Sequence, residues 1–130
     1  MFKPKLFRSN SGFTLIEIVA VLVILGILAA IVVPRFVYLE NQAKQKSLDT
    51  IRIEMNGREI LTWANHKLST SGFVSDAKIF AELNLNLDPS FSWNPGDPKP
   101  TGGILNFKGQ SYTFSRSAST NLKSAVWIQK

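Results

Sequence analysis

An apolar run near the N-terminus constrains this chain more than any other feature of its sequence. Residues 13–33 contain one charged side chain, Glu17, and residues 18–33 are uncharged and mostly aliphatic. A helix rising about 1.5 Å per residue would extend this run over about 30 Å, the thickness of a bilayer core. Pro34 and Arg35 end the run. We therefore expect a membrane-spanning helix followed by a domain outside the membrane.

A short basic segment precedes the run. Residues 1–12 contain Lys3, Lys5 and Arg8 and no acidic side chain. Because basic residues flank spanning helices on the cytoplasmic side, we expect a single pass with a cytoplasmic N-terminus. These three charges also supply much of the formal net charge of +6, so the basic composition argues little for nucleic-acid binding.

Two simpler interpretations of the segment explain less. A cleaved secretory signal needs small residues before its cut, whereas the run ends in the bulky residues Ile31, Val32 and Val33. A plain uncleaved anchor leaves Glu17 unexplained, because a carboxylate within a spanning helix costs a few kcal/mol and usually has a functional partner.

The hexapeptide from Gly12 to Glu17, GFTLIE, resembles the processing motif of type IV prepilins and type II secretion pseudopilins. The resemblance extends to Arg35 and includes Gly26 and Pro34. It implies that a prepilin peptidase cuts after Gly12 and methylates the new N-terminal residue, Phe13. It also implies that Glu17 is needed for assembly and that the apolar helix remains as the filament core.

Physical chemistry supports these implied roles. Cleavage would create an amine at Phe13, one helical turn from Glu17. In a dry filament core an unpaired carboxylate is costly, and an amine from a neighbouring subunit would neutralise it and fix the axial stagger. Gly26 and Pro34 have two interpretations. They loosen the helix locally, or they allow close helix packing with a gentle kink.

The resemblance implies a structural subunit of a pilus-like helical filament of identical copies, assembled from the inner membrane by an assembly platform. The assembled location would be an extracellular pilus. The alternative is a type II secretion pseudopilin, which would form a periplasmic pseudopilus. A lesser alternative is a minor pilin that captures DNA through scattered basic residues near aromatic ones. Those basic residues are Lys99, Lys108, Arg116, Lys123 and Lys130.

The chain is expected to divide into a leader, residues 1–12, a membrane and filament-core helix, residues 13–34, and a further part, residues 35–130. Apolar residues at helical spacing predict that the helix continues through the Asn56-Gly57 pair to about Asn65. One stripe comprises Phe36, Leu39, Ala43, Leu48, Ile51 and Met55. A second comprises Ile53, Ile60, Ala64 and Leu68.

The remaining sequence predicts an α+β fold in which a small antiparallel sheet packs on the long helical spine. Ser75 is an expected N-cap of a short helix that ends near Leu83. Residues 88–103 contain four prolines and predict an extended surface loop. Strands at 104–107 and 110–115 flank a two-residue turn, with Leu105 opposite Tyr112. Residues 125–129 would add a third strand.

Sites of other kinds have little support in the sequence. The single histidine, His66, lies near the expected helix end, where a solvent-facing or capping role fits better than catalysis, so no enzyme is predicted. No cofactor is expected, although Asp88, Asn94 and Asp97 are weak candidates for calcium ligands in a loop. The tryptophans, Trp63, Trp93 and Trp127, are expected to anchor a core or an interface.

Overall fold

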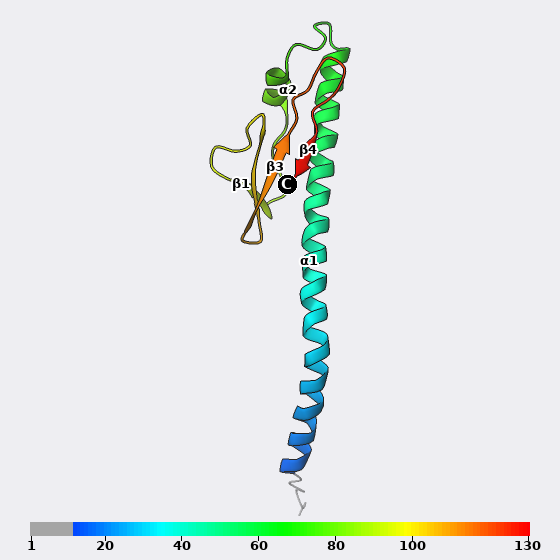
Figure 1. Ribbon diagram of the computed structural model, residues 1–130, viewed down its shortest axis with the longest axis vertical. Coiled ribbons are helices and arrows are strands. Elements are labelled where there is room, and N and C mark those ends of the chain that lie inside the picture. The colour runs from blue at the N-terminus through cyan, green and yellow to red at the C-terminus, as the bar shows by residue number, and fades with distance from the viewer. Residues whose placement is uncertain (1–11) are drawn as a thin grey trace, which may run out of the picture. The chain divides into compact units, whose positions relative to one another are not determined.

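A computed structural model describes residues 12–130, and Figure 1 shows their helices and strands. The helices are α1 (Leu15–Leu68) and α2 (Asp76–Glu82). The strands are β1 (Phe91–Trp93), β2 (Gly102–Phe107), β3 (Gln110–Arg116) and β4 (Trp127–Gln129). The chain forms two compact units, Met1–Ala43 and Lys44–Lys130, and the predicted α+β class is confirmed.

Helix α1 is 54 residues long and includes Pro34. It continues through Asn56 and Gly57, as the apolar periodicity predicts. It ends at Leu68, one turn beyond the expected end at Asn65, and Gly72 follows with a φ of 62°. The positive φ at Gly72 suits a residue without a Cβ and helps to turn the chain away after the helix.

The sheet contains four antiparallel strands in the order β1-β2-β3-β4, so each strand pairs with its neighbour in sequence. The predicted hairpin is confirmed, with Leu105 opposite Tyr112. Its turn residues, Lys108 and Gly109, both have positive φ, the geometry of a tight two-residue turn that matches strand twist.

The prediction of an extended surface loop over residues 88–103 is wrong in two places. Strand β1 lies inside it and pairs with β2, and the ring of Phe91 stacks on that of Phe107 at 4.3 Å between centroids. Strand β2 also begins early, at Gly102, where an added Cβ would lie 2.1 Å from the Phe114 carbonyl oxygen. These residues have the composition of a loop, but pairing with distant segments of the chain orders them as strands.

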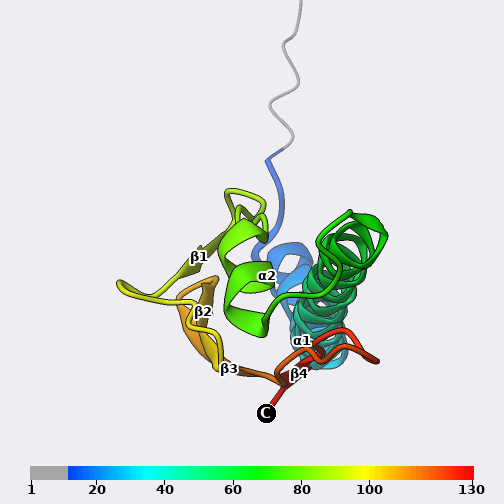
Figure 2. The same ribbon diagram turned by 90° about the horizontal axis from the view of Figure 1, so that it is seen from above.

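The last strand is shorter than predicted and is the fourth of the sheet. Strand β4 covers only Trp127–Gln129 of the expected 125–129 and pairs with β3. Figure 2 shows β4 beside α1, with β1 at the opposite edge of the sheet. The short helix α2 forms as predicted, because the Ser75 side chain accepts a hydrogen bond from the Lys78 backbone N–H.

The core of the Lys44–Lys130 unit lies between α1 and the sheet. Helix α1 contributes Leu48, Ile51 and Met55, the second half of the first predicted stripe. The other buried members are Leu83, Leu105, Phe107, Phe114 and Trp127. In the second predicted stripe, Ile53, Ile60 and Leu68 are exposed and Ala64 is half-buried. One face of α1 therefore holds the domain and another is left uncovered.

Candidate functional site

Thr14 and Glu17 form a capping box at the start of α1. Thr14 precedes the first helical residue, and its backbone N–H and hydroxyl donate to Glu17 Oε2 at 2.7 Å and 2.9 Å. The Glu17 N–H lies 3.4 Å from Thr14 Oγ1. Threonine followed three residues later by glutamate is the sequence signature of this motif, which was not among the features predicted above. The carboxylate is thus oriented at the N-terminus of the helix, where the helix dipole favours negative charge.

The segment around this carboxylate is exposed throughout. Every residue from 12 to 43 is solvent-exposed in the isolated subunit, including Phe13 with 84% of its surface accessible. An 18-residue window of α1 has a mean hydropathy of 3.1, so α1 is long and apolar enough to cross a membrane. Such exposure of aliphatic side chains is stable only against lipid or another apolar surface.

The other residues of the N-terminal prediction lie in or before this helix. Gly12 and Phe13 precede α1, and the rest of the leader, residues 1–11, lies outside the described residues. Gly26 and Pro34 lie within α1, which is helical at both positions. A Cβ at Gly26 would meet no atom within 4 Å of the same subunit, so the isolated subunit supplies no packing reason for a glycine there.

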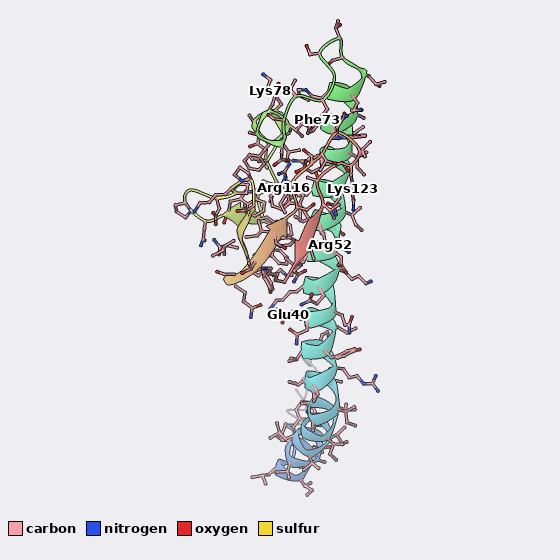
Figure 3. The ribbon with its side chains drawn as sticks, turned by 45° about the horizontal axis from the view of Figure 1, so that its top comes forward. Glu40, Arg52, Phe73, Lys78, Arg116 and Lys123 are labelled. Atoms are coloured by element: carbon pink, nitrogen blue, oxygen red, sulfur yellow. The ribbon has the colours of Figure 1, made fainter. Side chains whose placement is uncertain are left out.

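A buried charge cluster in the Lys44–Lys130 unit went unpredicted. Arg116 on β3 forms two hydrogen bonds with Glu59 on α1 through Nε and Nη2, the latter at 3.1 Å. Its Nη1 and Nη2 also donate to Asp76 at the start of α2, at 3.0 Å and 2.9 Å. The Arg116 and Glu59 side chains are completely buried. Figure 3 shows Arg116 within the domain, and the cluster joins both helices to the sheet.

Further donors complete the cluster. Trp127 Nε1 donates to Glu59 Oε1 at 2.9 Å, and the backbone N–H of Ser119 donates to Asp76 Oδ1 at 2.7 Å. Burial alone would raise the pKa of Asp76, but the hydrogen bonds from Arg116 and Ser119 outweigh burial and lower this pKa below its usual value. Asp76 and Arg116 therefore remain ionised and paired near neutral pH.

The cluster overturns one part of the DNA-binding alternative. Arg116 was expected among scattered surface charges, but its guanidinium is buried and bound by two carboxylates. A buried arginine cannot contact a phosphate backbone. The remaining predicted residues, Lys99, Lys108, Lys123 and Lys130, are exposed.

The calcium candidates each accept a hydrogen bond from a different donor. Asp88 accepts from Ser90 N–H at 2.9 Å, Asp97 from Ile104 N–H at 2.9 Å, and Asn94 Oδ1 from the Asn106 side chain at 2.6 Å. Within residues 12–130, no group of three or more acidic or histidine side chains is arranged to hold a metal ion.

His66 and the tryptophans have structural contacts. His66 Nε2 lies 2.8 Å from Glu82 Oε2. The His66 side chain therefore links the end of α1 to α2 and does not simply face solvent. Trp127 is completely buried and Trp93 packs against the core, as expected for anchors. Trp63 is half-buried and donates to the Thr120 carbonyl oxygen at 2.8 Å.

Comparison with known proteins places these features in a family. Residues 7–33 match the prokaryotic N-terminal methylation motif. The chain is 33% identical to the major component of the narrow type IV pilus of Thermus thermophilus over 109 residues, 84% of this chain and 90% of that protein. No solved structure matches the chain.

Two further relatives belong to type II secretion systems. Core protein G of Escherichia coli is 39% identical over 94 residues, 67% of this chain and 65% of that protein. Core protein G of Pseudomonas aeruginosa is 65% identical over 37 residues, 28% of this chain and 26% of that protein. The methylation motif, the apolar run at the start of α1 with Glu17 as its one carboxylate, and the match over nearly the whole pilus component agree. The chain belongs to the type IV pilin family.

Proposed function

We propose that this chain is the precursor of a pilus subunit, cut between Gly12 and Phe13 and assembled into a helical filament of identical copies. The observation that carries the proposal is the oriented carboxylate of Glu17, one turn from the proposed new N-terminus, in an otherwise uncharged and exposed segment. Before assembly the segment spans the inner membrane once, with its N-terminus in the cytoplasm, where prepilin peptidase and the assembly platform act on it. After assembly it lies in the core of an extracellular fibre.

Glu17 is the proposed determinant of stagger. In the isolated subunit its known hydrogen bonds come from Thr14, a neutral residue of the same turn. Those bonds satisfy the carboxylate without neutralising it. In a dry core the positive amine at Phe13 of a neighbouring copy supplies the missing charge, and such a pair forms only at one axial offset.

Gly26 and Pro34 have a proposed mechanical role. Pro34 cannot donate a backbone hydrogen bond within α1, and Gly26 has a low helix propensity. We place the weak part of the spine between them, where the helix loosens when the assembled fibre is under tension.

Processing is tested at the proposed cut. Intact mass and N-terminal sequencing of the mature protein should give a chain that begins at Phe13 and carries one added methyl group. A bulky replacement such as Gly12→Leu should leave the uncut precursor in the membrane. A mature chain that starts at Met1, or after Val33, would contradict the proposal.

Assembly is tested at Glu17 by comparing membrane and sheared-fibre fractions of three variants. Glu17→Val makes the segment more apolar, so insertion and cleavage should continue while fibres are lost. Glu17→Gln should be intermediate, because an amide forms hydrogen bonds without neutralising an amine. Wild-type amounts of regular fibre from the valine variant would show that Glu17 does not set the stagger.

A second candidate function is that of a type II secretion pseudopilin, favoured by the match to core protein G of two bacteria. The match to the pilus component covers more of both chains, so the pilus is the first proposal. Imaging of cells separates them, because a pilus forms long surface fibres and a pseudopilus stays short and periplasmic. Calcium-dependent stabilisation of the domain would favour the pseudopilin.

A further inference from the structure

The part of α1 within the Lys44–Lys130 unit carries an uncovered apolar surface. We call this surface the outer strip. It consists of Ile53, Gly57, Ile60, Leu61, Ala64 and Leu68, which recur at intervals that place them on one side of a helix. The accessible fractions are 65% for Ile53, 53% for Ile60, 66% for Leu61 and 87% for Leu68. Ala64 is half-buried, and the buried residues of α1, Leu48, Ile51, Met55 and Glu59, lie on the opposite side of the helix.

Charged side chains along this stretch are held by partners in their own subunit. Arg58 pairs with Glu54 and donates to the carbonyl oxygens of Asn84 and Asn86 at 2.8 Å and 2.6 Å. Lys67 donates to Asn121 at 2.8 Å. Glu59 and His66 are held by Arg116 and Glu82, as described above. None of the six residues of the outer strip is charged, so the strip itself offers an apolar contact and no ion pair.

Gly57 lies in the middle of the outer strip, and no contact inside the subunit explains why this residue is a glycine. A Cβ at this position would meet no atom within 4 Å, and the backbone is ordinary helix. Glycine in an exposed helix interior is less favourable than alanine. The subunit therefore carries a destabilising residue at the point of the outer strip where a second backbone could approach most closely.

We propose that the outer strip is a contact surface for a second copy of this chain, with Gly57 as the point of closest approach. The proposal rests on the proposed filament function. Copies of a filament subunit stand side by side in a fixed orientation, so an apolar, charge-free helix face on each copy is covered by its neighbour. The strip would extend the contact between copies from the apolar run of α1 to the folded domain. The domain would then also help to determine the geometry of the filament.

Thiol labelling tests the contact because the wild-type chain has no cysteine. The variant Ile60→Cys is reacted with a maleimide in sheared fibres and in membrane-embedded, unassembled subunits, and each rate is divided by that of the denatured subunit. Lys108→Cys, on the exposed hairpin turn, is the matched control. We expect labelling at 60 to slow by at least about tenfold in fibres only, because a packed interface excludes water, while position 108 reacts at similar rates in both states.

Three results would overturn the contact: equal rates at 60 in both states, equal slowing at 60 and 108, or slowing in the unassembled subunit, which would assign the strip to lipid. Wild-type cells without fibres would instead contradict the proposed function, so the two failures are distinguishable.

Gly57 supplies an independent test with effects of opposite sign. Gly57→Leu raises helix propensity, so the unfolding temperature of the full-length subunit in detergent should stay the same or rise. Its bulk separates the copies, and the fibre yield should fall by about tenfold or more, the equivalent of about 1.4 kcal/mol. Gly57→Ala should share the stability gain with a smaller loss of fibre. An undiminished fibre yield from the leucine variant would overturn the role of Gly57.

Discussion

Two glutamates on the same helix have opposite surroundings. Glu17 lies in an exposed apolar segment and accepts hydrogen bonds from Thr14 of its own turn. Glu59 is completely buried and is bound by Arg116 and Trp127, which are 57 and 68 residues away in sequence. A carboxylate held only by its own turn can be released to a partner in another subunit at little cost. A carboxylate that accepts three hydrogen bonds from two distant residues cannot leave them without weakening the fold.

The largest effect should come from Arg116→Leu. This change leaves Glu59 and Asp76 without their cation, and breaking a buried pair by removing one partner costs about 3–5 kcal/mol. Urea unfolding of a fragment that begins at Phe36 measures the loss. Arg52→Leu is the control, because its pair with Asp49 is partly exposed and contributes about 0–1 kcal/mol. Similar losses for the two variants would show that the cluster does not hold the domain.

Part of the stability of the Lys44–Lys130 unit should be lost in acid because of Asp76. Its pKa is lowered in the fold, so its contribution to stability is complete above the usual aspartate pKa of about 3.9 and is lost as the pH falls through the lower folded value. The urea midpoint of the same fragment should fall as the pH drops below about 4. Asp76→Asn should be less stable at neutral pH and should flatten that fall. An unchanged pH profile in the asparagine variant would contradict this assignment.

A smaller effect is expected at Glu82, which is half-exposed. Hydrogen bonds from His66 and then Lys78 lower the pKa of Glu82, so its stabilisation is also present above its ordinary pKa and lost in acid. Water screens this exposed carboxylate. Glu82→Gln should therefore lower the unfolding temperature far less than Arg116→Leu does. A comparable drop in thermal scans would mean that the link between α1 and α2 matters more than its exposure implies.

The smallest effect should be that of Glu17→Gln on the folded domain. Its contacts are confined to the first turn of α1, so thermal unfolding of the domain in detergent-solubilised full-length protein should not change. A clear shift in the near-ultraviolet circular dichroism transition would show that the carboxylate supports the fold as well as assembly. No shift, together with the reduced fibre yield expected of this variant, would separate the two glutamates by function.

Local patterns predicted the features that local chemistry determines. Helix α1, the N-cap at Ser75 and the hairpin at Lys108-Gly109 all follow from residues within one or two turns of each other. The capping box of Thr14 and Glu17 could have been predicted in the same way, because its two residues have the required spacing. The family resemblance of residues 12–35 rests on the same kind of short-range signal.

Features built by distant segments could not be predicted in this way. The sequence patterns assign no role to Glu59 and place Arg116 among scattered basic residues, because no residue near either one in the sequence indicates that the two would pair. Strand β1 is three residues long, too short for an alternating pattern, and it is ordered by pairing and by the stacking of Phe91 on Phe107. Only the folded chain brings these groups together.

The charge cluster also acts as a cross-link between chain segments. It ties residues 59, 76 and 116 together in a protein without cysteine, and so closes two long loops without a covalent bond. In the folded chain the cluster holds these segments together as a disulfide would, but it does not restrict the unfolded chain as a disulfide does. Unlike a disulfide, this closure needs no oxidant and is indifferent to reducing agents, and acid rather than thiol chemistry opens it. The domain can therefore close as soon as its strands pair, whatever the redox state of its surroundings.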